Sequence, residues 1–145
     1  YFMFGVIMSI IAGASMSVQG VFNTRLSEKV GTFEANAIVQ GTAFILGLIV
    51  MFIFRKGDLG KISEVNKLYL FGGVLGIIIT ITVMLAIKNL NPTYGISIIL
   101  IAQLLVAAII DAFGLFGSEK MTFGWAKFAG LGLMIAGVLL FKLKS

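Results

Sequence analysis

Five long apolar runs, separated by short segments of charged and turn-forming residues, make up the chain. The runs cover residues 2–22, 34–54, 68–87, 92–116 and 123–141. Each is about 20 residues long, the length of helix that crosses a hydrocarbon layer of ~30 Å. The runs are continuous rather than alternating, so β-strands are not expected. The pattern predicts an all-α membrane protein with five transmembrane helices, in a single transmembrane domain over residues 1–145.

Local signals place the starts of three of these helices. Asn91 followed by Pro92 is typical of an N-cap and a first helical position. Thr32 is a candidate N-cap for the second helix, with Glu34 in the first turn, where the helix dipole favours a negative charge. Thr122 is the corresponding candidate for the fifth helix.

Charged residues are expected at the ends of the spans. Lys127 can reach back from the entry of the fifth span to the membrane interface, where Trp125 is expected to act as an anchor. The segment between the first two spans is expected to form a loop that holds Arg25, Glu28, Lys29 and Gly31.

Composition narrows the function. The chain is 59% hydrophobic and 12% charged, whereas soluble domains carry about 25% charged residues, so we interpret it as an integral membrane protein. The absence of cysteine and histidine excludes disulfides, thiolate metal sites, imidazole proton relays and Ser-His triads. We therefore expect no enzyme activity, no metal and no cofactor. The net charge of +5 is spread over segments that flank the spans, which favours a lipid bilayer over nucleic acid as the partner.

Positive charges are nearly balanced across the membrane. With five spans, one side holds six lysines and arginines, which are Arg55, Lys56, Lys61, Lys67, Lys120 and Lys127. The other side holds five, which are Arg25, Lys29, Lys88, Lys142 and Lys144. Orientation follows an excess of positive charge on the cytoplasmic side, and this tally has almost none, so dual topology, in which copies insert both ways, is one of two open interpretations. The alternative is a single orientation set by residues 55–67 or by residues outside this sequence.

Asp111 is the one acidic residue deep within an apolar run, and Gln103 lies on the same helical face. A carboxylate at a helix centre costs roughly 2.5–3.5 kcal/mol, so such a group usually faces a partner or a water-filled path. The alternative is an interfacial carboxylate that reaches toward headgroups or Lys120. Gln19 and Asn23 form a polar face on the first span, where the alternative role is helix packing.

Other polar and small residues fit helix packing. Asn36 and Gln40 are one turn apart on the second span. Small residues also recur on single faces of the third and fifth spans, where they allow close helix approach: Gly72, Gly76 and Thr80, then Gly130 and Gly137.

The order of motifs along the chain resembles the YdcZ-type membrane proteins. The resemblance covers Gly13-Ala14 through Gln19-Gly20, Asn23-Thr24-Arg25-Leu26, Gly31, Phe44 and Gly47, Gly72-Gly73-Val74-Leu75-Gly76, Gln103-Leu104-Leu105, Asp111-Ala112-Phe113-Gly114-Leu115-Phe116-Gly117, and Gly130 to Gly137. It implies the five-span branch of the drug/metabolite transporter superfamily, which is related to the small multidrug resistance proteins and located in the bacterial inner membrane. Those proteins use a glutamate in the first span, and this chain has Gln19 in that region instead.

The resemblance and the residues together predict a small-molecule secondary transporter, an exporter that works as a ten-helix antiparallel homodimer or with a homologous subunit. Asp111, Gln19, Asn23 and Gln103 would bind the substrate or the proton. The sequence predicts one acidic residue within the membrane and no buried lysine or arginine, which favours cationic or neutral substrates over anions. The alternative is a non-transporting membrane subunit or an assembly partner of another membrane complex.

Overall fold

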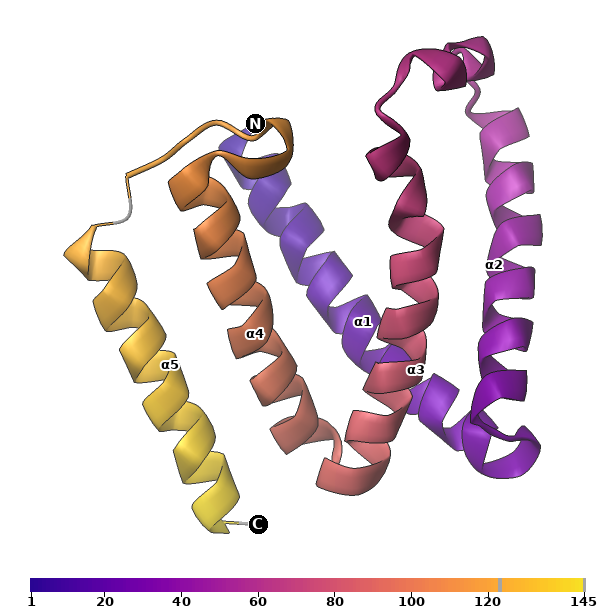
Figure 1. Ribbon diagram of the computed structural model, residues 1–145. Helices are drawn as coiled ribbons and strands as arrows, with labels where there is room; N and C mark the ends of the chain where they lie inside the picture. The colour runs from indigo at the N-terminus through magenta and orange to yellow at the C-terminus, as the bar shows by residue number, and fades with distance from the viewer. Residues whose placement is uncertain (123, 145) are drawn as a thin grey trace. The chain divides into compact units, whose positions relative to one another are not determined.

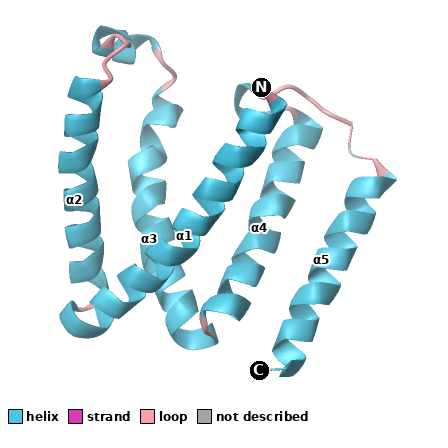
Figure 2. Cartoon of the chain, turned by 180° about the vertical axis from the view of Figure 1, so that it is seen from behind, coloured by secondary structure: helices cyan, strands magenta, loops and turns pink. Residues whose placement is uncertain are grey.

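The computed structural model describes residues 1–122 and 124–144 (Figure 1). Its long helices are α1 (Phe2–Val30), α2 (Thr32–Ile53), α3 (Gly72–Leu90), α4 (Pro92–Phe113) and α5 (Trp125–Lys144). Short 3-10 helices are η1 (Leu59–Glu64), η2 (Lys67–Phe71) and η3 (Leu115–Gly117). The described residues contain no strand, and those outside the helices form loops (Figure 2). Within this part of the chain, five helical segments are long and apolar enough to cross a membrane, which confirms the predicted class.

The chain divides into two compact units, residues 1–88 and residues 89–145. In the first unit α1 packs against α2, and Gly31 is the single residue between them. Its φ of +105° is accessible to glycine at little cost, and its N–H donates to the carbonyl of Ser27 at 2.9 Å. The change of direction between the two helices therefore depends on this glycine.

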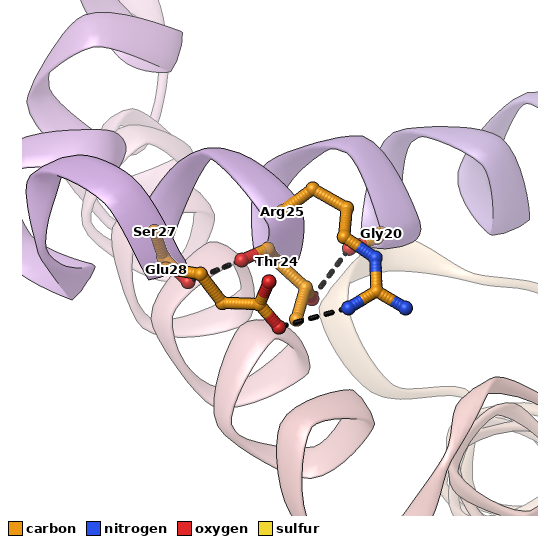
Figure 3. Close-up of polar contacts among 5 residues, drawn as sticks. All are labelled: Gly20, Thr24, Arg25, Ser27 and Glu28. Atoms are coloured by element: carbon orange, nitrogen blue, oxygen red, sulfur yellow. Dashed lines mark hydrogen bonds and ion pairs between the residues drawn. The ribbon is translucent and has the colours of Figure 1, made fainter.

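The expected loop at residues 25–31 is wrong, because α1 remains helical through Val30. Arginine, glutamate and lysine are good helix formers, so they end an apolar run without ending a helix. Arg25 and Glu28 form an ion pair of 2.9 Å along the exposed side of α1 (Figure 3). The charged residues therefore show where the apolar run ends, and the helix continues for about one more turn beyond Arg25.

The start of α2 also differs in detail from the prediction. Thr32 is not the N-cap: Gly31 occupies that position, without a side-chain hydrogen bond, and Thr32 is the first helical residue. Glu34 does lie in the first turn, as predicted, and its carboxylate folds back over Gly31. The negative charge therefore sits at the positive end of the helix dipole.

A close crossing joins α1 to α3. A Cβ added at Gly20 would lie 2.8 Å from Cδ1 of Ile87 and 3.3 Å from Cγ1 of Val83. Nearby buried polar groups are satisfied locally, since the hydroxyl of Thr24 donates to the carbonyl of Gly20 at 2.7 Å and that of Ser27 to the carbonyl of Thr24 at 2.6 Å (Figure 3). These hydroxyls lie inside the unit without the cost of an unmade hydrogen bond.

In the second unit α4 packs against α5. The predicted start of α4 is confirmed: Asn91 is the N-cap, its side chain accepts from the N–H of Tyr94 at 3.0 Å, and Pro92 is the first helical residue. The helix ends at Phe113, earlier than the expected residue 116, because Gly114 adopts a left-handed conformation with φ +62°.

The entry of α5 falls later than the sequence indicated. The helix begins at Trp125, so Thr122 lies ahead of it and the proposed Thr122 cap is wrong. Residue 123, the expected start of the fifth span, lies outside the described residues. The N–H of Met121 donates to the carbonyl of Asp111 at 2.7 Å, which ties the connecting segment to the end of α4.

Candidate functional site

Asp111 lines a cavity of about 320 Å³ between α4 and α5. It lies two residues before the end of α4 and is partly buried. Its carboxylate makes no hydrogen bond or ion pair with any residue in the described part of the chain. An acidic side chain within an apolar span thus faces a space large enough for a ligand.

The cavity walls are almost entirely apolar. They are formed by Leu104, Ala107 and Ala108 of α4 and by Gly130, Leu131 and Met134 of α5. A Cβ added at Gly130 would meet no described atom within 4 Å, so a side chain there would extend into open space. The packing role expected for Gly130 has no counterpart within this unit, where the residue is part of the cavity wall.

Lys127 lines the same cavity as Asp111. Sequence reasoning placed it at the interface and assigned it no part in the site. A geometric signal was available: Asp111 is two residues before the end of α4, and Lys127 is two residues after the start of α5. When two antiparallel helices pack together, such positions come to the same level.

Gln103 does not line this cavity. It is exposed on α4, eight residues before Asp111, which is ~12 Å along the axis at about 1.5 Å per residue. Gln19 and Asn23 line a shallow groove on α1 together with Ala14, Ser15, Val18 and Phe22. Within that groove Gln19 is exposed, whereas Asn23 is only 9% exposed. The structure therefore brings Gln19 and Asn23 together and separates Gln103 from the Asp111 cavity.

Sequence reasoning did not connect Gln40 with the third span. The amide nitrogen Nε2 of Gln40 on α2 donates to Oγ1 of Thr80 at 3.0 Å and to the carbonyl of Gly76 at 3.3 Å, both on α3. The same nitrogen also approaches Oδ1 of Asn36 at 3.3 Å. Gly76, expected to pack closely, offers its carbonyl to this amide, and a Cβ there would meet no described atom within 4 Å.

Comparison with known proteins identifies the family. The family model described as "Putative inner membrane exporter, YdcZ" matches residues 4–140. A search of the curated proteins found no match, and a search of the solved structures found none. The family match agrees with the five apolar helices and favours transport over enzyme catalysis. The chain belongs to the YdcZ family of exporters and is an integral inner-membrane transporter.

Proposed function

We propose that the protein is a secondary transporter that exports a small molecule, with Asp111 as the residue that binds substrate or proton. One observation supports this most strongly: the carboxylate of Asp111 lines a cavity within the membrane-spanning part of the chain and has no partner among the described residues. An unpaired charge in that setting is costly, so it is explained best by a ligand that arrives and leaves.

The functional unit in this proposal is an antiparallel homodimer, or a pair with a homologous subunit. In this proposal each helix crosses the membrane once in chain order, which would put Gln19 and Asn23 toward the opposite membrane face from Asp111. In an antiparallel pair, Asp111 of one copy reaches the level of Gln19 and Asn23 of the other, as in inverted-repeat transporters. Gln103 adds a further amide on the helix of Asp111, and these amides orient the substrate through hydrogen bonds.

Water access to Asp111 tests the site. The chain has no cysteine, so Asp111→Cys creates a unique thiol, and Ile109→Cys on the apolar side of α4 is the matched control. A membrane-impermeant thiosulfonate should label Asp111→Cys in reconstituted vesicles and leave Ile109→Cys unlabelled, because only a water-filled path supports a thiolate. If the thiol of Asp111→Cys is not labelled, Asp111 is not reached by water and the proposed transport site is refuted.

The orientation of the chain in the membrane tests the proposed antiparallel homodimer. Single cysteines placed in the 55–67 segment and after Lys142 should each be labelled from both sides of the membrane if the chain has dual topology. Labelling of each site from one side only would remove the antiparallel homodimer and leave a homologous, oppositely inserted partner as the second half of the site.

A non-transporting subunit of another membrane complex is the second candidate. The observation in its favour is open space: a Cβ added at Gly72, Gly76 or Gly137 would meet no described atom within 4 Å, so a partner helix could approach closely there. If the thiosulfonate does not label the thiol of Asp111→Cys, this second function is favoured.

A further inference from the structure

Residues 54–67 leave the end of α2 and lead through η1 to the start of η2 and α3 (Figure 1). Side-chain caps give this segment a defined conformation. Oδ1 of Asp58 accepts from the N–H of Gly60 at 2.9 Å at the start of η1. Oδ1 of Asn66 accepts from the N–H of Leu68 at 3.0 Å at the start of η2. Because the segment joins two helices long and apolar enough to cross a membrane, it lies at the membrane surface.

Apolar side chains of this segment have no cover among the described residues. Leu59 is 68% exposed and Ile62 is 57% exposed. They are three residues apart in η1, and a 3-10 helix has three residues per turn, so they lie on one face. Phe54, at the end of α2, is 70% exposed. In water this exposure is unfavourable, whereas at a membrane surface such side chains contact lipid.

Basic residues outnumber acidic ones in the same segment. The basic residues are Arg55, Lys56, Lys61 and Lys67, and the acidic residues are Asp58 and Glu64. None of the four basic side chains forms an ion pair or a hydrogen bond with a described residue. Lys61 lies one 3-10 turn from Asp58 and one from Glu64, which weakens its attraction for an anion. Arg55 and Lys56 are therefore the pair best placed to bind one.

Arg55 and Lys56 line a pocket of about 350 Å³ at the end of α2. Apolar residues line it as well: Met51, Phe54 and Leu59. Asp58 is the one acidic residue in the wall, and its Oδ1 is already held by the N–H of Gly60. The negative end of the α2 dipole also attracts cations, but it does not account for the apolar residues beside them. Two cations next to an apolar wall match an amphiphile with an anionic head.

We propose that this pocket binds the headgroup of an anionic phospholipid, with an acyl chain against Met51 and Phe54. Arg55 holds the phosphate through two parallel N–H groups, and Lys56 adds a second positive charge. A free phosphate would gain nothing from the apolar part of the wall, so the pocket fits a lipid better. This lipid site does not depend on the proposed role of Asp111.

Quenching of tryptophan fluorescence by brominated lipid tests the site. Phe54→Trp in a Trp125→Phe background puts the single tryptophan of the chain in the pocket wall. The vesicles contain equal parts of phosphatidylcholine and phosphatidylglycerol, and the acyl chains of one lipid at a time carry bromine. Both leaflets have the same composition, so the orientation of the chain does not affect the result. Phosphatidylglycerol should bind about tenfold more tightly at low salt, because each basic residue near an anionic lipid adds about fivefold and Asp58 opposes them.

Two double variants remove the same charge from different places. Arg55→Gln with Lys56→Gln should abolish the preference for phosphatidylglycerol, whereas Lys61→Gln with Lys67→Gln should leave most of it. The exchange Arg55→Lys with Lys56→Arg should keep the preference, which separates loss of charge from misfolding.

Three results would overturn the lipid site. The first is equal quenching by the two brominated lipids in the reporter protein. The second is an equal loss of preference in the two double variants, because the net charge of the segment would then set it. The third is loss of the preference when glycerol 3-phosphate is added, because the pocket would then take a free phosphate.

Discussion

Gln40 provides the sharpest test of how the first unit is held together. Its amide connects α2 to α3 through Oγ1 of Thr80 at 3.0 Å and the carbonyl of Gly76 at 3.3 Å. Gln40→Met keeps the length and flexibility of the side chain and removes the amide. The variant therefore isolates the hydrogen bonds from the packing.

The expected loss follows from the donors and acceptors. The amide nitrogen shares two hydrogens among three acceptors, two on α3 and Oδ1 of Asn36 on α2 itself. An interhelical hydrogen bond in a membrane protein averages ~0.6 kcal/mol, so two such bonds to α3 set the upper end of the loss. The loss should be about 1 kcal/mol. It should not be larger, because the hydroxyl of Thr80 can turn back to the carbonyl of Gly76, as that of Thr24 does to Gly20.

The assay is unfolding of the purified protein in mild detergent by increasing SDS, followed by far-UV circular dichroism. Gln19→Met is the matched control, because Gln19 is exposed and its amide makes no hydrogen bond with any described residue. Thr80→Val should cost about 0.6 kcal/mol alone and much less in the Gln40→Met background. If Gln40→Met equals the Gln19→Met control, or if the effects of Gln40→Met and Thr80→Val simply add, the assigned connection between α2 and α3 is refuted.

Three further outcomes are expected. Gly31→Ala should destabilise the protein by about 1–3 kcal/mol in the same unfolding assay, because φ +105° with ψ 156° is strained for alanine, whereas Gly13→Ala inside α1 should cause no loss. Asn91→Ala should cost about 1 kcal/mol and Asn91→Gly only a few tenths, since glycine keeps the positive φ; an equal loss in both would contradict the cap. Lys56→Gln with Lys61→Gln changes the charge tally from six against five to four against five, so cysteine labelling should shift toward copies with the C-terminal end in the cytoplasm; an unchanged ratio would show that other residues set orientation.

Sequence predicts best those features whose causes are local. The start of α4 is correct because an Asn-Pro pair acts within one helical turn, from Asn91 to the N–H of Tyr94. The predicted end of α1 is wrong because the charges at residues 25–29 show where the apolar run ends, whereas the helix itself ends at Gly31. The Thr122 cap fails for a related reason: a threonine is a suitable cap residue, but it does not decide where the helix begins, and α5 begins at Trp125.

The residues of the candidate site also differ in whether local sequence is enough to predict them. Asp111 is recognisable from sequence alone, because a lone acid in an apolar run is conspicuous. Lys127 is not, because its role depends on how α5 lies against α4, and the sequence alone supports an interfacial position equally well. Gln40 and Thr80 are 40 residues apart, and their contact requires the rotation of two helices about their own axes. The contribution of Gln19, Asn23 and Gln103 to the site stays a prediction.

The two units are held together in different ways, and this difference bears on where a substrate-linked movement belongs. Lipid is as apolar as leucine, so apolar burial does not drive helices together in a bilayer; close packing and hydrogen bonds do. The first unit has both, in the tight approach of α3 to Gly20 and in the amide of Gln40. In the second unit α4 and α5 leave an open cavity between them, and its wall includes Asp111 and Lys127. Atoms that line a cavity lack van der Waals contacts, and a bound ligand supplies these contacts. We therefore expect binding there to favour a closer approach of α5 to α4. The second unit is therefore where we expect substrate to act, with the first unit as the more rigid body.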